Sequence, residues 1–391
     1  MDFRIPTLFL VAALAACASH ASRPQDPAKR SLAAPQNSAK EKELPVPKES
    51  STAILHVAQQ TSPNGTELYG YKNQAGSFAI SAVYEFALEF SDGLAFAKDS
   101  EGFVCIDNGG KEVFRVSSDL QLESGFAGGW AMVKRADRTF SYLDKQGKLL
   151  PLKLERARAY SEGLAAVRVN GRWGFLGAKG SLQIQAVFPE VFDFHEGLAA
   201  AVQDDHMGFI DASGAWVIPP EFELVGNFGS GLAPAQPGDE DGWGSTKMGY
   251  IDHTGRFSIP ASFGHAHAFS ENKARVLSAN SNDHWIYIDT EGKQVGSVSF
   301  SECEDFSNGM AAVQIAGKWG YIDDSGVLTI AALYSRAGSF SSGTALVIRA
   351  ERDGNGNQRE GRIDKMGHWI ESRDRNPQDD ILPTPASPTM P

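Results

Sequence analysis

One ten-residue stretch, repeated with variations, decides the fold of this chain: Gly317-Lys318-Trp319-Gly320-Tyr321-Ile322-Asp323-Asp324-Ser325-Gly326. Its Asp position recurs every 33 to 41 residues over nine copies, at Asn73, Asp107, Asp144, Gly177, Asp211, Asp252, Asp289, Asp323 and Asp364. A second landmark keeps the same spacing, three residues after an aromatic residue, at Gly93, Gly129, Gly163, Gly197, Gly231, Asn272, Gly309 and Gly343. A fixed period of this length is typical of a solenoid, a propeller or an array.

The residues around the Asp position predict a strand followed by a turn. Trp319 and Tyr321 are separated by two residues, which places both rings on one face of an extended strand. The intervening Gly320 indicates that another backbone or ring approaches closely. The Asp-x-x-Gly that follows favours a type I turn, because Asp at the first position accepts backbone hydrogen bonds and Gly suits the fourth.

Each copy also carries an upstream hairpin. Residues 163–169 form a run typical of a strand, and Asn170-Gly171 is a two-residue hairpin signal that joins this run to Trp173. The segment after the turn, such as 219–222 (Pro-Pro-Glu-Phe), predicts a short third strand and an irregular return. No stretch of the repeat region shows helical periodicity over ten residues. The sequence therefore predicts all-β repeats.

These repeats resemble the bacterial WG-repeat family, whose Trp-Gly pair is present at Trp173-Gly174 and Trp319-Gly320. The resemblance covers residues 65–370 and implies tandem β-repeats of about 34–41 residues, with no activity common to the family. We expect about eight repeats and a degenerate ninth in an elongated, β-solenoid-like array, with a closed propeller-like ring as the alternative. Glu360 and Arg362 occupy normally apolar positions, which suits a solvent-facing end repeat and favours the open form. Gly177 replaces the Asp of one copy, so this Asp is not an obligatory ligand or catalyst in every repeat.

Residues 1–17 are typical of a lipoprotein signal peptide. Arg4 precedes a short apolar stretch, and Leu14-Ala15-Ala16-Cys17 fits a lipobox. We expect a lipid on Cys17 to hold the protein in the cell envelope, with soluble secretion or a periplasmic location as the alternative. Ala18 after the Cys favours the outer membrane, facing the periplasm, by analogy with lipoproteins in general.

The remaining boundaries follow from composition. Residues 18–63 predict a disordered Ala/Ser/Pro/Lys-rich tether, 64–370 the repeat region and 371–391 a disordered Pro-rich tail. The net charge is −12, the pI is about 5.3 and no basic stripe is evident, so we expect no nucleic-acid partner. Cys105 occupies the aromatic position of the second repeat, where it acts as a small buried hydrophobe, and lies too far from Cys303 to form a disulfide in an open array.

The candidate metal sites are weak. His265 and His267 would share one strand face, but a zinc site needs three or four ligands and nothing nearby completes one, which favours a polar strand edge. Residues 353–357 resemble the start of a calcium loop, yet Gln358 stands where that loop needs Gly, so a hairpin loop is the better interpretation and calcium the alternative. We predict no catalytic residue, no resident metal and no cofactor, because no nucleophile elbow, phosphate loop or zinc-protease pattern appears.

Trp216 and Trp243 lie outside the Trp position of the repeat and are the candidate binding surface. Exposed on one face, they would stack on sugars or anchor a protein partner, whereas Trp130 is explained as a packed substitute for Leu. The leading hypothesis is a non-enzymatic envelope lipoprotein whose repeats form a protein–protein interaction scaffold. The alternative is a module that binds peptidoglycan or another glycan, and the third hypothesis is a metal-dependent or catalytic envelope protein.

Overall fold

The computed structural model describes residues 55–62, 65–238, 246–278, 284–352 and 356–375, with side chains up to residue 370. All of them belong to one compact unit, residues 52–391. The described residues form strands and turns and contain no helix, which confirms the predicted all-β class. Within them, accordingly, no helix has the length and apolar character needed to cross a membrane.

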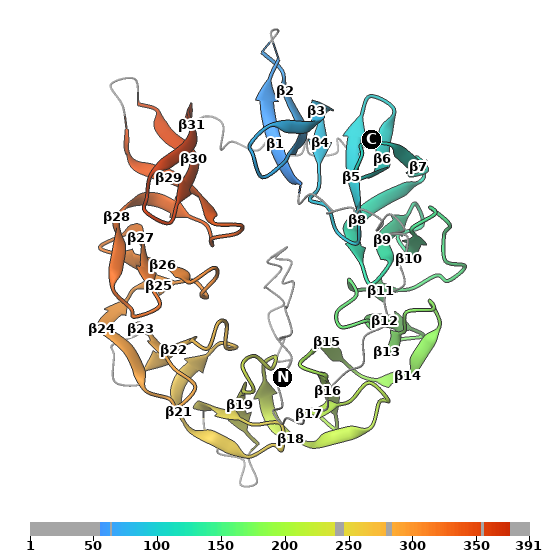
Figure 1. Ribbon diagram of the computed structural model, residues 1–391. Helices are drawn as coiled ribbons and strands as arrows, with labels where there is room; N and C mark the ends of the chain where they lie inside the picture. Colours follow the sequence, from blue (N-terminus) through green and yellow to red (C-terminus); the bar gives the residue numbers. More distant parts are fainter. Residues whose placement is uncertain (1–54, 63–64, 239–245, 279–283, 353–355, 376–391) are drawn as a thin grey trace, which may run out of the picture. The chain divides into compact units, whose positions relative to one another are not determined.

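The strands are numbered in chain order in Figure 1. Those of the first four repeats are β1 (His56–Thr61), β2 (Glu67–Lys72), β3 (Phe78–Tyr84), β4 (Phe86–Ala87), β5 (Leu94–Asp99), β6 (Gly102–Asp107), β7 (Glu112–Arg115), β8 (Leu120–Ala127), β9 (Trp130–Arg135), β10 (Phe140–Asp144), β11 (Arg156–Ala157), β12 (Ala165–Val169), β13 (Arg172–Leu176) and β14 (Leu182–Phe188). Those of the later repeats are β15 (Val191–His195), β16 (Leu198–Gln203), β17 (His206–Ile210), β18 (Trp216–Val225), β19 (Ala233–Pro237), β20 (Met248–Ile251), β21 (Phe257–Ala266), β22 (Ala274–Ser278), β23 (Trp285–Ile288), β24 (Gln294–Phe300), β25 (Glu302–Cys303), β26 (Met310–Ile315), β27 (Lys318–Asp323), β28 (Leu328–Ala337), β29 (Thr344–Arg352), β30 (Gln358–Asp364) and β31 (Trp369–Arg375).

A complete repeat is a four-stranded antiparallel sheet. In the fifth repeat β15 is the first strand, β16 and β17 are the second and third, and β18 is the outer strand. β18 then pairs with β19 from Phe222 onward and so also supplies the first strand of the sixth repeat. The predicted irregular return is therefore wrong here, because Pro219 and Pro220 lie inside a strand. An outer strand has an unpaired edge, which tolerates the missing N–H of proline.

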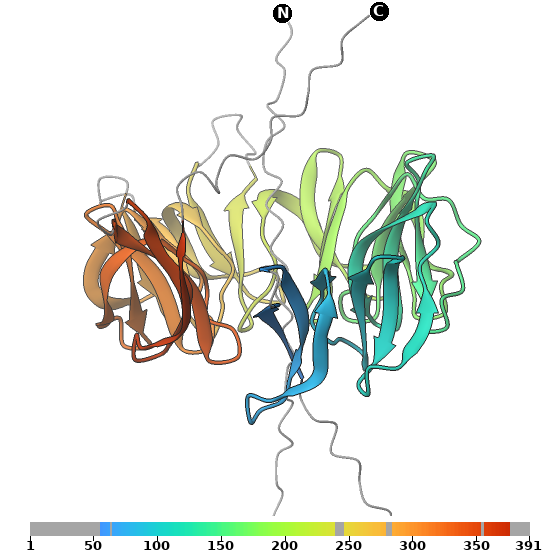
Figure 2. The same ribbon diagram turned by 90° about the horizontal axis from the view of Figure 1, so that it is seen from above.

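Every ladder joins strands that are consecutive in the sequence. Among the described strands, β1 pairs only with β2 and β31 pairs only with β30, so no ladder joins the two ends of the array. Figures 1 and 2 show the repeats following one another in chain order. The protein is thus a tandem β-repeat array, as predicted.

The core lies between neighbouring repeats. Tyr321 of the eighth repeat packs edge-on against Phe340 of the ninth, with ring centroids 4.9 Å apart. The Tyr321 hydroxyl also donates a hydrogen bond to the Gly338 carbonyl at 2.7 Å. The same ring pair recurs between other repeats, for example Phe175 with Phe194 at 4.8 Å. The aromatic position of one repeat and the Phe position of the next therefore form the contact that stacks the array.

The ends of the repeat region differ from the predicted limits. β1 begins at His56, inside the predicted tether, and Leu55 is buried against Tyr71 and Ala97. The hairpin β1–β2 completes the first repeat, which explains why residues 56–61 are ordered into a strand. At the other end β31 runs to Arg375, beyond the predicted residue 370. Residues 1–54, with Cys17, and residues 376–391 lie outside the described part of the chain.

Two cysteines of the described region are free and buried. Cys105 packs against Phe96 and Phe126, which confirms its predicted role as a small hydrophobe. Burial raises the pKa of the Cys303 thiol to about 12. Both thiols serve packing in this fold.

Candidate functional site

Each repeat presents two edges. The turn edge carries the connection between the first and second strands and the Asp-x-x-Gly turn between the third and outer strands. The hairpin edge carries the connection between the second and third strands, because antiparallel strands reverse direction at every step. Where both strands are assigned, the third-to-outer connection has four or five residues in every repeat. The hairpin connection ranges from two residues at 170–171 to ten at 238–247. At the turn edge, by contrast, isolated bridges such as Ser161 with Leu164 close the first-to-second connection to two residues.

The Asp position serves the turn itself. The Asp323 carboxylate accepts hydrogen bonds from the amides of Ser325 at 2.9 Å and Val327 at 3.1 Å, and the Gly326 amide donates to the Asp323 carbonyl. These contacts, led by the Ser325 hydroxyl, lower the pKa of Asp323. The side-chain pattern recurs at every copy except Gly177, whose turn keeps the backbone bond. The predicted turn is confirmed, and the carboxylate is occupied by the chain's own amides.

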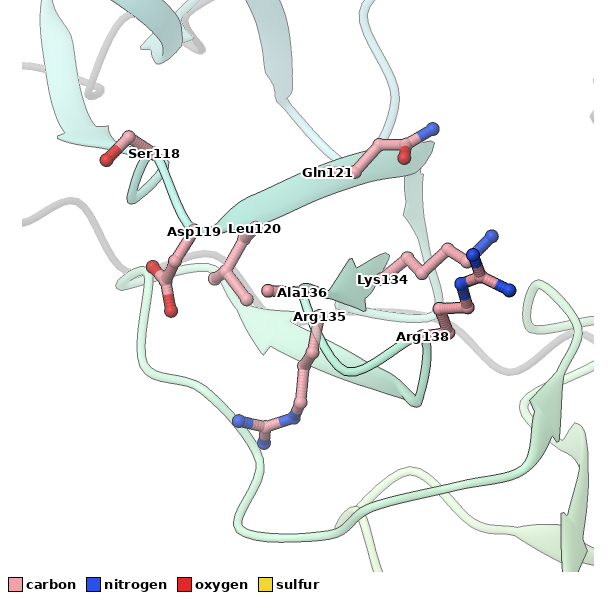
Figure 3. A pocket seen from close by; sticks show the side chains of 8 residues that line it. All are labelled: Ser118, Asp119, Leu120, Gln121, Lys134, Arg135, Ala136 and Arg138. Carbon is pink, nitrogen blue, oxygen red and sulfur yellow. The ribbon is translucent and has the colours of Figure 1, made fainter. Parts of the chain in front are cut away.

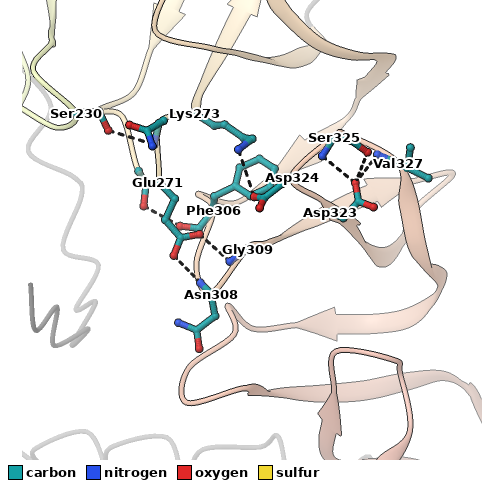
Figure 4. A network of polar contacts seen from close by, with 12 residues as sticks. Ser230, Glu271, Lys273, Phe306, Asn308, Gly309, Asp323, Asp324, Ser325 and Val327 are labelled. Carbon is teal, nitrogen blue, oxygen red and sulfur yellow. Dashed lines mark hydrogen bonds and ion pairs between the residues drawn. The ribbon is translucent and has the colours of Figure 1, made fainter. Parts of the chain in front are cut away.

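A second set of side chains links neighbouring repeats along the turn edge (Figure 4). The Glu271 carboxylate accepts hydrogen bonds from the Asn308 amide at 2.8 Å and the Gly309 amide at 2.7 Å of the next repeat. Glu271 and Asn308 both have positive φ, which belongs to the two-residue hairpin that joins the first and second strands. The equivalent donor–acceptor links are Gly129 to Asp92, Glu196 and Gly197 to Glu162, Gly231 to Glu196, Asn272 to Ser230, and Gly343 to Asn308.

We call these side chains the turn-edge ladder. They were not predicted from the sequence because the ladder residue differs between repeats and is Asp, Glu, Ser or Asn. The shared signal is a side-chain oxygen directly before the landmark position. Lys273 strengthens the same edge, since its ammonium group lies 3.3 Å from the Asp324 carboxylate and 5.0 Å from the centre of the Phe306 ring (Figure 4). The ladder residues and Lys273 therefore hold neighbouring repeats together.

At the hairpin edge the Trp-Gly pair is part of the core. Trp173 is buried, and the Arg158 guanidinium lies 5.0 Å from the centre of its ring while pairing with Glu190 at 3.1 Å. A Cβ on Gly174 would lie 2.5 Å from the Ile184 carbonyl oxygen, which confirms the predicted close approach. The glycine of the pair thus fixes the position of the outer strand.

The two candidate histidines lie together but are not completed as a metal site. The rings of His265 and His267 stack with centroids 4.9 Å apart, and the ring of Trp285 lies 5.3 Å from His267. Burial and then the charge of Arg275 lower the pKa of His267 to about 4, while Arg275 pairs with Asp305 at 2.8 Å. In the described part of the chain, no group of three or more His, Cys, Asp and Glu side chains is placed to hold a metal ion.

The structure does not bring the two candidate tryptophans together. Trp216 is half-buried, with its ring edge-to-face on Phe188 at 5.9 Å, and Trp243 lies outside the described residues. Trp130 stacks on Tyr160 and donates a hydrogen bond from its indole N–H to the Ala178 carbonyl at 3.0 Å. Trp130 is therefore packed, as predicted. Residues 353–355 of the possible calcium loop also lie outside the described part.

The surface has two shallow hollows of note, each of about 400 Å³. One lies between the eighth and ninth repeats, where Trp319 and Leu346 form its apolar part. The other lies in the third repeat, at the hairpin β9–β10, and is lined by Ser118, Asp119, Leu120, Gln121, Lys134, Arg135, Ala136 and Arg138 (Figure 3).

The second of these hollows marks a basic segment that the sequence analysis missed. Residues 130–172 contain ten Lys and Arg but only four Asp and Glu, although the whole chain has a net charge of −12. Counting charged residues in successive short windows of the sequence reveals this basic segment, whereas the net charge of the whole chain conceals it.

Comparison with known proteins gives the family. A family model described as a WG containing repeat matches residues 69–103, 140–173, 173–205, 207–239, 248–280, 285–319 and 319–349. No curated protein matches the sequence significantly.

Among solved structures, a crystal structure of the eukaryotic initiation factor is similar, with 13% identity and a TM-score of 0.55 over 83% of this chain and 96% of that one. The computationally designed Ika8 protein has 14% identity and a TM-score of 0.39 over 67% and 90% of the two chains. Apo AztD from Citrobacter koseri has 12% identity and a TM-score of 0.35 over 70% and 92%. At these identities the likeness concerns the fold alone, and the repeats carry the assignment: the chain belongs to the WG-repeat family.

Proposed function

We propose that this protein is a non-catalytic binding scaffold that holds a protein partner on the hairpin edge of its repeats. The observation that supports this is the contrast between the two edges. The turn edge has short turns, of two residues between the first and second strands and four or five between the third and outer strands, and its side chains bond to the next repeat, as Glu271 does to Asn308. The hairpin edge has connections of two to ten residues. Variable loops on a rigid frame are where binding residues usually lie.

The location of the scaffold is part of the same proposal. Leu14-Ala15-Ala16-Cys17 supports lipid attachment at Cys17, and residues 18–54 between this Cys and the first strand are long enough to separate the repeats from a membrane surface. We propose a lipid-anchored protein of the cell envelope, at the outer membrane and facing the periplasm. Incorporation of a labelled fatty acid into the native chain, and its absence from the Cys17→Ala variant, is the expected result.

The experiment that tests the binding proposal is a pull-down of tagged full-length protein from envelope extracts, with Cys17→Ala in parallel. Bound material is separated into protein and glycan. We expect a stoichiometric protein partner whose recovery falls without the anchor, because the anchor places the scaffold at the surface where the partner lies. Recovery of peptidoglycan fragments without such a protein would instead favour glycan binding, and Trp216 and Trp243 would be replaced next.

A photo-crosslinking amino acid then maps the edge that is used. It is placed at Arg172 or Lys318 on the hairpin edge, and at Lys179 or Lys293 on the turn edge as matched controls. All four side chains are exposed. The proposal expects the partner to be crosslinked from the hairpin edge only. Equal crosslinking from both edges, or from the turn edge alone, would refute it.

A further inference from the structure

Four cations of the third and fourth repeats share the hairpin edge, and we call them the basic edge: Lys134, Arg138, Arg156 and Arg172. None of the four is bound to a carboxylate of the described residues. Lys134 lies 5.6 Å from the centre of the Phe140 ring, and the side chains of the three arginines have neither an ion pair nor a hydrogen bond there. Figure 3 shows that the side chains of Lys134 and Arg138, which come from the same hairpin, extend to the same side in that view.

The turn between β9 and β10 places Arg138 at the surface. Its φ is 67°, in the left-handed region that other turns of the array also use at non-glycine residues, such as Glu271 and Asn308. The four-residue connection thus presents the exposed Arg138 side chain at the hairpin edge.

The fourth repeat adds an unfavourable pair. Arg156 lies directly opposite Arg168 on the neighbouring strand, and like charges in that arrangement destabilise a sheet. Glu155 lies 3.8 Å from Arg168 and also accepts a hydrogen bond from the Gly171 amide, so this carboxylate is shared. Arg156 has no such partner and is exposed. An anion bound from outside would relieve the repulsion.

The cations lie on adjoining backbone segments. Lys134 pairs with Phe140, and Phe140 bridges to Leu154, two residues before Arg156. Arg172 pairs with Val169, next to Arg168. Counting the four strand spacings of about 4.8 Å from β9 to β13, the basic edge is on the order of 20 Å across. An extended segment of about six residues spans that length.

We propose that the basic edge binds an acidic segment of the scaffold's protein partner, with carboxylates of that segment paired to Lys134, Arg138, Arg156 and Arg172. This inference rests on the proposed function and names the chemistry of the partner. Arginine suits carboxylates because its planar guanidinium group donates two parallel hydrogen bonds to the two carboxylate oxygens. The charge of the segment is complementary to an edge that is basic within an acidic protein.

Other anionic partners fit the surface less well. Asp119 and Asp137 lie within or beside the basic edge, so a flat anionic bilayer would meet negative charges that a narrow peptide can avoid. Binding of single-stranded nucleic acid usually adds aromatic stacking, but Trp173 is only 6% exposed and Trp130 is already packed on Tyr160. A protein segment is therefore the occupant that the geometry favours.

The test uses the full-length protein and a fluorescein-labelled peptide of alternating glutamate and serine, with a glutamine–serine peptide as the uncharged control. Fluorescence anisotropy measures affinity for native protein, for Lys134→Glu/Arg138→Glu and for Arg156→Glu/Arg172→Glu. The matched control is Lys179→Glu/Lys293→Glu, which makes the same change of charge on the turn edge. Each exposed ion pair contributes up to about fivefold in affinity, so we expect each basic-edge variant to lose about tenfold. Added salt should weaken the native complex, as screening shortens the range of exposed charges.

Four results would overturn the proposal. They are equal loss in the turn-edge control, no binding of the acidic peptide, preferred binding of phosphatidylglycerol vesicles or an oligonucleotide, and self-association that the basic-edge variants abolish. Circular dichroism and thermal unfolding of every variant establish that the fold is intact.

The envelope pull-down keeps this test separate from the proposed function. If the basic-edge variants still capture the native partner, the scaffold stands and the basic edge is not its site. If native protein captures no partner, the scaffold proposal fails whatever the peptide does.

Discussion

Replacing Gly320 by alanine tests whether the glycine of the Trp-Gly pair is required by the outer strand. Trp319 pairs with Tyr334 and Tyr321 pairs with Ile330, so residues 331–333 all lie opposite Gly320. An added Cβ would lie 2.6 Å from the Ile330 carbonyl oxygen and 2.8 Å from the Ala332 amide nitrogen. These are backbone atoms, so the strand itself has to move. Overpacking of this kind costs about 1–3 kcal/mol, and the lower chain entropy of alanine in the unfolded state offsets about 0.4–1 kcal/mol.

The expected net loss of about 1–2 kcal/mol is local, because a repeat array does not unfold in one step. Hydrogen exchange of β27 and β28 is therefore the measurement, and protection should fall by about 5–30-fold. The matched control is Gly125→Ala in β8, where a Cβ would meet nothing within 4 Å, so protection there should hold or rise slightly. Unchanged protection in Gly320→Ala, or an equal loss in Gly125→Ala, would refute the reasoning.

Three further outcomes follow from the contacts. Glu271→Ala removes the acceptor of two backbone amides of the next repeat. Local stability at Asn308 and Gly309 should fall by about 1 kcal/mol, which is measured as faster amide hydrogen exchange. Glu271→Gln keeps one acceptor oxygen and should lose less. The pKa of His267 falls from 6.5 to about 4 on folding, so the unfolded chain binds the proton more readily between these values. Local stability should accordingly be highest above about pH 6.5 and fall as the pH drops towards about 4, and His267→Asn should flatten that fall in hydrogen exchange of β21 and β22. Cys105 and Cys303 are buried with raised thiol pKa values of about 12, so both should react with a thiol reagent only after denaturation, and rapid labelling of native protein would contradict their placement.

The stacking contacts of the fold were predictable because they follow a short period. The spacing of Trp319 and Tyr321 assigned both rings to one strand face, and the structure has Tyr321 fully buried and Trp319 packed at the edge of the same cluster. The Asp turn was predictable for the same reason, because its whole hydrogen-bond pattern lies within five residues. A short pattern of contacts that recurs in every repeat can therefore be predicted from a single sequence.

The outer strand and the two edges could not be predicted in this way. Pro219 and Pro220 argued against a strand, and only the free edge of β18 makes them acceptable. The turn-edge ladder joins residues such as Glu162 and Gly197, which lie 35 positions apart and form no short-range pattern. The basic edge combines side chains from two repeats, so it depends on how those repeats stack.

The second repeat shows that the glycine of the Trp-Gly pair can be replaced while the repeat still stacks on its neighbours. In the second repeat Val104 occupies the glycine position, and the outer strand there pairs directly, Val104 with Arg115, without three residues crossing over it. The repeat still stacks, because Cys105 contacts Phe96 and Phe126 on the core side. Stacking thus depends on the aromatic position and the turn edge, while the hairpin edge tolerates changes of length, charge and strand pairing. Any difference in binding between repeats should therefore be sought on the hairpin edge, which is where Lys134, Arg138, Arg156 and Arg172 lie.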